Sequence, residues 1–367
     1  MNKFPGSVCF YCADQNTHRD RSRGITRYTL GLLSHLRDSK GLNLVAVTSK
    51  SSIEIPSGIE RISLPFKSDH LFGRLAADHF HPLILPKIRA DIWHYPKGFL
   101  PYGRQVCAKR VGTIADVMLQ HDADHHPESR SRFAFTYWLG VLKHSIKNLD
   151  LILTVSEFSK RSILEFGHRH QLNCPPIVVT YQGVTVSKEV EPGSIGKQDY
   201  VVHLASKLSY KATTWLLEQW SSLAESRKDL PELRLVGDLD ARGAAIFSKM
   251  AKVSLVPSLP RPQLEDLIAK ARALLLPSEI EGFGIPAVES YLLGTAVAYA
   301  RGTALEEIVG IGSPGGFERD RDSLASALLD VLAMERSFVI AKGDQLRLKY
   351  NWVDCVQRTL EAYQTIP

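Results

Sequence analysis

Short apolar runs that alternate with amphipathic helical patterns constrain the fold of this chain more than any other feature. Strands buried on both faces and separated by helices are typical of parallel sheets. The predicted strands are 7–13, 43–49, 61–65, 91–95, 110–116, 151–155, 177–181, 200–205, 232–236, 253–256, 273–277 and 296–300. The predicted helices include 25–37, 132–147, 158–166, 212–224, 263–271, 286–293 and 321–334. The pattern predicts an α/β protein with doubly wound parallel sheets.

The alternation stops once, at the polar stretch 187–198, and then begins again. A chain of 367 residues is also longer than one ordinary core requires. We therefore expect two domains joined near residue 190. Because ligands of such sheets bind beyond the carboxyl ends of the strands, the interdomain cleft is the expected active site.

The composition is that of a soluble globular protein, with 44% hydrophobic and 23% charged residues. No apolar run reaches the roughly 18–20 residues that cross a bilayer, and the first residues lack a signal-peptide pattern. These features predict a cytoplasmic location. The net charge of +6 fits an anionic partner such as a nucleotide, a lipid headgroup or a nucleic acid.

Five cysteines, an odd number, argue against a disulfide framework in a chain without a secretion signal. Cys9 and Cys12 form a Cys-x-x-Cys without a second pair, inside the first predicted strand. We favour core packing for both over metal or redox chemistry. The other three are Cys107, Cys174 and Cys355.

The strand at 273–277 leads into the segment with the clearest chemical pattern, Glu279-Ile280-Glu281-Gly282-Phe283-Gly284-Ile285-Pro286-Ala287-Val288-Glu289. Pro286 suits the first turn of a helix, and Gly294 is placed to end it. The Gly-Phe-Gly turn exposes backbone N–H groups to oxygen-rich ligands at a helix start. Glu281 and Glu289 can accept hydrogen bonds from the hydroxyls of two sugars. Either Glu alone would be explained by a plain helix start.

The whole segment closely resembles the signature of the family 4 (group 1) glycosyltransferases, Glu-Gly-Phe-Gly-x-x-x-x-Glu. That family is retaining and has the GT-B fold, so the resemblance implies two facing Rossmann-like domains with an interdomain cleft. It also implies that Glu281 holds the donor-sugar hydroxyls and Glu289 the ribose. Gly282, Phe283 and Gly284 would then contact the donor, a nucleotide-diphosphate sugar that serves as co-substrate without a cofactor or a metal.

Further segments resemble the same family along nearly the full chain. Residues 22–28 are similar to its first loop, with Gly24 near the donor phosphates, and 150–160 and 304–310 are similar to two later parts. Residues 350–363 resemble its C-terminal helix, which crosses back to the first domain. The implied domains are an acceptor-side domain at 1–188, a donor domain at 189–350 and a crossing helix at 351–367.

Lys207 and Lys211 follow the first strand of the second domain, where the family has a basic pair. Two ammonium groups there suit a diphosphate whose charge grows as the sugar leaves. The family usually has Arg in place of Lys207 and a slightly longer gap between the two basic residues. The alternative interpretation is that both lysines are solvated loop residues without a role in binding. The Glu motif makes this alternative less favoured.

Residues 112–116 depart from the pattern of the family, which commonly has His-Asp there. Asp116 remains as a donor-site residue, but Ala115 replaces the His that often contacts the donor sugar. His121, His125 or His126 are candidates to replace it. We predict instead that 121–126 is a solvated or acceptor-facing loop, and that its Asp122-Ala123-Asp124 is not a metal site.

The stretch 133–147 is aromatic and flanked by basic residues. We favour packing on the first-domain sheet, with peripheral membrane attachment as the alternative. No nucleic-acid-binding module is recognisable.

The sequence thus predicts a retaining, metal-independent hexosyltransferase that moves a hexose or deoxyhexose, mannose- or rhamnose-like, onto a glycan or glycolipid acceptor. The resemblance favours bacterial O-antigen, lipopolysaccharide or exopolysaccharide synthesis, and a GDP-sugar slightly over UDP- or dTDP-sugars. A non-catalytic sugar- or nucleotide-binding subunit and a nucleotide-sugar epimerase or phosphorylase are the alternatives.

Overall fold

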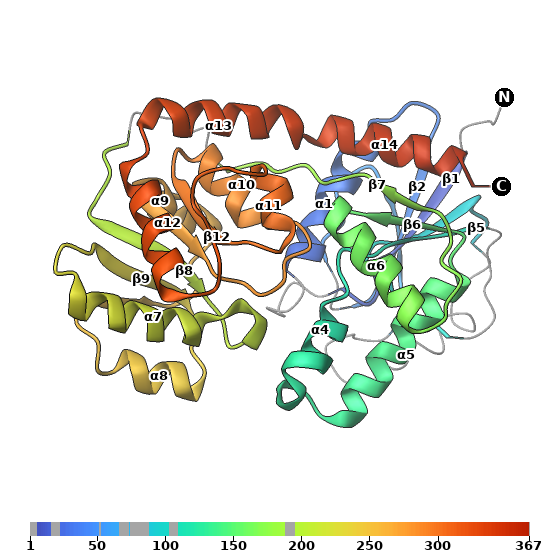
Figure 1. Cartoon of the computed structure of the whole chain (residues 1–367). Helices are drawn as coiled ribbons and strands as arrows, with labels where there is room; N and C mark the ends of the chain where they lie inside the picture. Colours follow the sequence, from blue (N-terminus) through green and yellow to red (C-terminus); the bar gives the residue numbers. More distant parts are fainter. Residues whose placement is uncertain are drawn as a thin grey trace. The chain divides into compact units, whose positions relative to one another are not determined.

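The computed structural model describes residues 6–15, 23–50, 53–65, 73, 88–102, 109–187 and 195–366. They form two compact units (Figure 1). Unit 1 contains Met1–Gln120, Arg130–Gly183 and Tyr350–Pro367, and unit 2 contains His121–Ser129 and Val184–Lys349. The expected boundary at 188/189 and Cys107 lie outside the described residues.

Unit 1 is built on a seven-stranded parallel sheet in the order β3-β2-β1-β4-β5-β6-β7. Its strands are β1 (Ser7–Tyr11), β2 (Asn43–Thr48), β3 (Glu60–Ser63), β4 (Ile92–Tyr95), β5 (Lys109–Thr113), β6 (Leu151–Thr154) and β7 (Ile177–Val179). Its helices are α1 (Arg23–Leu36), α5 (Arg132–Asn148), α6 (Glu157–Arg169) and α14 (Trp352–Gln364), and α4 (Met118–His125) begins in it.

Both faces of this sheet are buried, which explains the continuous apolar strands. Side chains alternate between the two faces of a strand. Cys9 and Tyr11 belong to a core cluster with residues of α5 and α6, whereas Phe10 packs on His94, which contacts Tyr363 of α14. Cys9 and Cys12 are fully buried, as core packing predicts.

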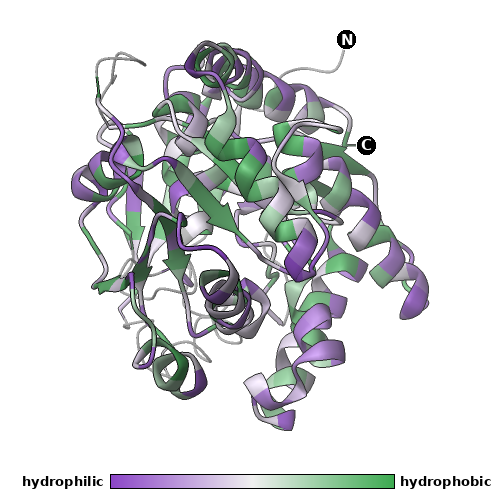
Figure 2. Ribbon diagram, turned by 60° about the vertical axis from the view of Figure 1, so that its left-hand side comes forward, coloured by the Kyte–Doolittle hydropathy of each residue, from purple (hydrophilic) through white to green (hydrophobic). Residues whose placement is uncertain are grey.

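Unit 2 has a six-stranded parallel sheet in the order β10-β9-β8-β11-β12-β13. Its strands are β8 (Tyr200–Ala205), β9 (Glu232–Gly237), β10 (Val253–Val256), β11 (Ala273–Leu276), β12 (Ala296–Ala300) and β13 (Gly316–Phe317). Its helices are α7 (Thr213–Ser226), α8 (Ala241–Phe247), α9 (Arg261–Lys270), α10 (Ile285–Leu292), α11 (Ala304–Val309), α12 (Arg321–Ala333) and α13 (Arg336–Lys349), with the short 3₁₀ turns η2 (Pro127–Ser129) and η3 (Ser209–Lys211). In Figure 2 the sheet strands are mainly hydrophobic, while helices carry polar faces.

The C-terminal helix α14 packs in unit 1 and is anchored by Trp352. A Cβ placed on Gly31 or Gly183 would lie 2.0 or 2.3 Å from the indole, so both positions require glycine to admit the ring. At the other end of α14, His94 Nδ1 lies 2.6 Å from the Tyr363 hydroxyl, and His94 Nε2 lies 2.7 Å from Thr113 Oγ1. This polar pair fastens the helix to the buried sheet.

All predicted strands and helices are present, with ends that differ by a few residues. One prediction is wrong: residues 121–126 are not a loop, because 118–125 form α4. Polar residues fill most of this helix, so its sequence lacks the apolar stripe that signals an amphipathic helix. The structure adds the helices α8, α11 and α13 and the two-residue strand β13 to the elements named from the sequence.

The buried His94 gives a test of this packing. Burial lowers the pKa of His94 to about 3, from 6.5 in the unfolded chain. Because the unfolded state takes up the proton first, the contribution to stability is complete above pH 6.5 and is lost as the pH falls towards 3. The loss is about 1.4 kcal/mol per pH unit.

His94→Gln, which cannot be protonated, is expected to show a shallower fall in the free energy of unfolding between pH 6.5 and 4.5 than the wild type. Urea unfolding at a series of pH values measures both slopes. His203, whose pKa is lowered to about 4, titrates equally in both proteins. Identical slopes would show that His94 is not held neutral.

Candidate active site

The Glu281–Glu289 segment has the predicted strand–turn–helix form. It leaves the buried strand β11, and Gly284 takes a left-handed conformation (φ 85°, ψ 53°) as the N-cap of α10. Pro286 lies in the first turn of that helix. The side chains of Glu281 and Glu289 are nearly buried, although both are carboxylates. Buried carboxylates need hydrogen-bonding partners, so their surroundings identify the site.

Gly284 allows this turn for two reasons. Few residues other than glycine adopt its positive φ without strain. A Cβ there would also lie 2.2 Å from Cδ2 of Leu305, in the first turn of α11. The same helix start donates the Ala304 N–H to the Glu281 carbonyl over 3.2 Å. Glycine therefore lets α11 pack directly against the turn that carries Glu281.

Gly294 ends α10 as expected. Its N–H donates to the Tyr291 carbonyl over 3.0 Å, and the Thr295 N–H donates to the Ser290 carbonyl over 2.8 Å. These two bonds and the positive φ of Gly294 form a Schellman motif. All of 287–292 are buried, so α10 is enclosed rather than a surface helix with one apolar stripe.

Glu281 is paired with Lys211, from the loop after β8. Lys211 Nζ lies 2.5 Å from Glu281 Oε1, and both side chains are mostly screened from solvent. The loop after β11 is tied to the same place, because the Glu279 N–H donates to the Tyr210 carbonyl over 2.7 Å. The ends of β8 and β11, adjacent strands of the sheet, thus bring the two predicted residues together.

His203 shapes the loop that carries Lys211, a role the sequence did not reveal. Its Nδ1 lies 3.0 Å from the Leu275 carbonyl and its Nε2 2.9 Å from Thr213 Oγ1. The carbonyl can only accept, so Nδ1 carries the proton and Nε2 accepts from Thr213. Thr213 Oγ1 in turn accepts the Ser206 N–H over 3.1 Å. Burial lowers the pKa of His203 to about 4, which keeps it neutral.

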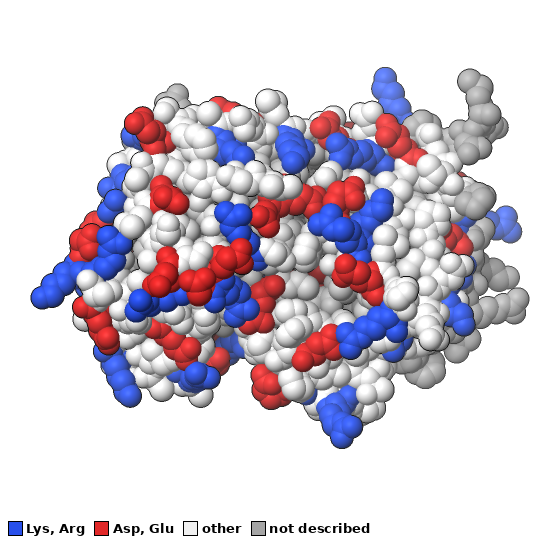
Figure 3. All heavy atoms as spheres, in the orientation of Figure 1, with Lys and Arg blue, Asp and Glu red and all other residues white. Residues whose placement is uncertain are grey.

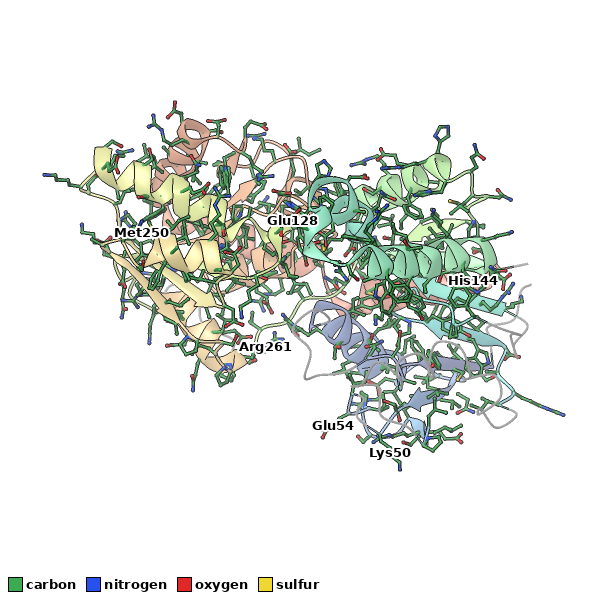
Figure 4. All side chains as sticks on the ribbon, turned by 90° about the horizontal axis from the view of Figure 1, so that it is seen from below. Lys50, Glu54, Glu128, His144, Met250 and Arg261 are labelled. Atoms are coloured by element: carbon green, nitrogen blue, oxygen red, sulfur yellow. The ribbon has the colours of Figure 1, made fainter. Side chains whose placement is uncertain are left out.

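Glu289 is paired with Arg261, at the start of α9, where Figure 4 labels it. Arg261 Nη2 lies 3.0 Å from Glu289 Oε1 and also donates to the Thr185 carbonyl. Arg261 Nε lies 2.6 Å from Glu265 Oε1, one helical turn later. The i, i+4 spacing of Arg261 and Glu265 was visible in the sequence, but their link to Glu289 depends on the fold.

Lys207 does not join this cluster. It is 63% exposed, and its Nζ lies 3.9 Å from Asp238 Oδ2 on the loop after β9.

In Figure 3 basic and acidic side chains are interspersed over the visible face, so the net positive charge forms no single patch there.

Gly24 and Asp116 lie in unit 1. Gly24 is exposed in the first turn of α1, and a Cβ added to it would have no atom within 4 Å. Asp116 Oδ1 accepts the Met118 N–H over 3.0 Å and so caps the start of α4. The neighbouring Ala115 carbonyl accepts a hydrogen bond from Ser159 Oγ over 2.7 Å. These contacts fix the backbone at 115–118.

His121 of α4 and His126, which follows its end, contact a carboxylate of unit 2. His121 Nε2 and His126 Nε2 lie 3.1 and 2.6 Å from Glu279 Oε2. His125 is exposed, and its Nδ1 faces the His121 carbonyl. Asp122 is buried and Asp124 exposed. Residues two apart on a helix do not face each other, so Asp122 and Asp124 do not form a paired metal site.

Glu279 is a site residue that the sequence did not single out. Arg319 Nη2 lies 2.7 Å from its Oε1, on the side away from the histidines. Desolvation raises the pKa of Glu279, but hydrogen bonds from His121 and His126 and the charge of Arg319 outweigh it, and the pKa falls to about 2. Glu279 is therefore ionised at any physiological pH.

The stretch 133–147 packs mainly within unit 1, which is the interpretation that the sequence favoured. Phe135, Val141, Leu142 and Ile146 of α5 are buried, whereas Phe133 is 80% exposed. Among the described residues, no helix is long and apolar enough to cross a membrane.

Residues 199–334 match the family model described as glycosyl transferases group 1. They contain the whole Lys211, Glu281 and Glu289 arrangement. The chain is a glycosyltransferase, and its residues 199–334 match group 1. This confirms the resemblance inferred from the Glu-Gly-Phe-Gly segment.

One curated relative and two solved structures span nearly all of this glycosyltransferase. It is 24% identical to the O-antigen chain mannosyltransferase B of Escherichia coli, with 94% of this chain and 96% of the relative covered. The structure of WaaG, a glycosyltransferase involved in lipopolysaccharide biosynthesis, has a TM-score of 0.67 at 18% identity and covers 98% and 99% of the two chains. Anabaena Alr3699/HepE, solved with UDP-glucose, has a TM-score of 0.63 at 15% identity over 98% and 99%. These structures confirm the predicted GT-B fold class, whereas the cleft between the two domains stays a prediction.

Replacement of Gly284 tests the turn. Gly284→Ala is expected to lower the free energy of unfolding by about 2–4 kcal/mol, because left-handed strain adds to the clash with Leu305. Gly302→Ala is the matched control, since its φ is 72° but no atom lies within 4 Å of the added Cβ. The control should lose only about 1–2 kcal/mol. Equal losses in chemical unfolding would contradict the packing role of Gly284.

Proposed function

We propose that this glycosyltransferase moves a mannose-like sugar from a nucleotide-diphosphate donor to a glycan or lipid-linked glycan, with retention of configuration. The observation that carries the proposal is the Lys211–Glu281 pair beside the turn that starts α10. It puts a cation, a buried carboxylate and a helix N-terminus at the carboxyl ends of adjacent parallel strands. Phosphate and sugar hydroxyls are the ligands that this set of groups suits.

In the proposed donor complex, the diphosphate pairs with Lys211 in place of Glu281. It also accepts hydrogen bonds from the N–H groups of Gly282, Phe283 and Gly284. Glu281, relieved of Lys211, accepts hydrogen bonds from the sugar hydroxyls. Charge develops on the diphosphate as the sugar–phosphate bond breaks, and a preorganised cation stabilises it most at that point. Lys207, at the exposed rim, would add a weaker long-range attraction because solvent screens it.

Glu289 is proposed to hold the ribose hydroxyls. Its partner Arg261 fixes the carboxylate through a bond at 3.0 Å and is itself held by Glu265. A carboxylate already oriented loses less freedom when a ligand binds. Gly24 and Asp116 remain proposed donor contacts from unit 1.

The sugar acceptor hydroxyl is proposed to attack the face from which the nucleotide leaves, while the departing phosphate takes the proton. The bond to the acceptor forms as the bond to phosphate breaks, so no protein nucleophile, cofactor or metal is assigned to the transfer. A place on the cytoplasmic face of the cell membrane suits lipid-linked acceptors, and exposed Phe133 is a candidate contact.

The mannose-like sugar and the role in O-antigen or lipopolysaccharide synthesis are supported by the E. coli mannosyltransferase and by WaaG. For the base, GDP is our proposal, with UDP as the competitor because Alr3699/HepE was solved with UDP-glucose. A non-catalytic binding subunit is the second candidate, because Ala115 stands where the family commonly has His.

Substitution of Lys211 tests the phosphate role. Lys211→Ala should lower kcat by about 10²–10³, the usual cost of losing one charge-stabilising group. Lys270→Ala is the control, since Lys270 forms an exposed ion pair with Asp266 on α9. Nucleotide release from a panel of donors, with acceptor present, is the measurement. Near-normal turnover of folded Lys211→Ala would refute the role, and wild-type binding without turnover would favour the non-catalytic subunit.

A thermal-shift screen with GDP, UDP and dTDP tests the donor. A ligand that binds only the folded state raises Tm, so GDP is expected to give the largest shift. Glu289→Ala should reduce the shift for GDP and UDP, because both carry the ribose hydroxyls that Glu289 is proposed to hold. The reduction should be smaller for dTDP, whose 2′-deoxyribose keeps only the 3′-hydroxyl. A larger shift with UDP would reject the GDP proposal, and a full shift in Glu289→Ala would reject the ribose contact.

A further inference from the structure

Two imidazoles and a carboxylate converge at the start of the Glu279–Glu289 segment. His121 Nε2 and His126 Nε2 face the same oxygen of Glu279, Oε2, at 3.1 and 2.6 Å. All three ligand atoms lie within 4.8 Å of one another, and each side chain is largely screened from solvent. We propose that His121, His126 and Glu279 form a three-ligand site for Zn²⁺ or a similar divalent transition metal, with the fourth position left to water.

The ligand types fit such a cation. Zn²⁺ is commonly held by imidazole nitrogen and carboxylate oxygen at about 2.0–2.2 Å, with tetrahedral ligand atoms roughly 3.3 Å apart. The His121–Glu279 separation already matches this spacing. The His126–Glu279 separation needs to open by about 0.7 Å to admit the ion. That shift is within reach of a side chain that follows the end of α4.

The second layer of contacts also matches a metal site. Arg319 holds Oε1 of Glu279 at 2.7 Å, which leaves Oε2 directed at the histidines. His126 Nδ1 lies 3.7 Å from Oε1 of Glu128, a residue of the turn η2 that Figure 4 labels. This separation is too long for a hydrogen bond, so Glu128 contributes charge near the ring and does not fix its orientation. Glu128 also adds negative charge that offsets the nearby guanidinium of Arg319.

The site would brace unit 2 rather than take part in sugar transfer. It joins the segment His121–Ser129 to Glu279. Glu279 lies a few positions after the end of β11 and two before Glu281. The Glu279 N–H donates to the Tyr210 carbonyl beside Lys211, so a bound ion would steady both loops. This inference does not rest on the proposed donor chemistry.

The experiment uses the full chain carried on a tag without histidine and stripped of metal by a chelator. Zn²⁺ is titrated in by calorimetry, and Co²⁺ is used as a spectroscopic probe. We expect one Zn²⁺ per chain, a higher Tm that EDTA reverses, and visible absorption bands of Co²⁺ bound to nitrogen and oxygen. No uptake, or no change in Tm, would overturn the proposal.

Three variants separate this site from other histidines. His126→Ala and Glu279→Gln should each weaken Zn²⁺ binding by at least about 100-fold, since each removes a ligand. His125→Ala is the matched control: it is a neighbouring, exposed histidine whose ring stacks on His121 but lies outside the cluster. It should bind Zn²⁺ like the wild type.

Unchanged affinity in His126→Ala and Glu279→Gln, or equal loss in His125→Ala, would assign the metal elsewhere and overturn the proposal. The Tm of each metal-free variant shows whether it folds. If Glu279→Gln unfolds, His126→Ala decides, because its ring is partly exposed and its loss leaves Arg319 and Glu279 paired.

Discussion

The Lys211–Glu281 pair is the contact on which the candidate site depends. Each group follows a different parallel strand, and each would be costly to bury without the other. Their meeting requires adjacent strands β8 and β11 to end at the same edge, with His203 and Gly284 shaping the two loops. The sheet topology thus converts residues 70 positions apart into one charged pair.

Sequence patterns were sufficient for the sheets because strands buried on both faces must be continuously apolar. Glu281, Glu289 and Lys211 were located by their resemblance to the family signature, and the positions of Glu281 and Lys211 after adjacent strand ends explain why these two meet. The helix α4 was missed because its contacts are polar and distant in sequence. No periodicity in the sequence indicates that His121 and His126 contact Glu279. The pairing of Glu289 with Arg261 likewise depends on tertiary packing.

The buried charges of unit 2 are arranged in small, satisfied groups. Glu279 meets Arg319 and two histidines, Glu281 meets Lys211, and Glu289 meets Arg261. Three carboxylates within 11 positions would repel one another in a site of low dielectric if they were unpaired. Separate cationic partners allow the segment to carry all three.

The course of the chain between the units has a consequence for dissection of the molecule. The backbone passes from one unit to the other four times, at 120/121, 129/130, 183/184 and 349/350. A fragment that stopped near residue 190 would contain the first sheet without Trp352, and the indole sites at Gly31 and Gly183 would be left unfilled. The packing against the first sheet would be restored by supplying the last helix as a peptide or by fusing it through a circular permutation. The two sequence halves therefore do not coincide with the two compact units.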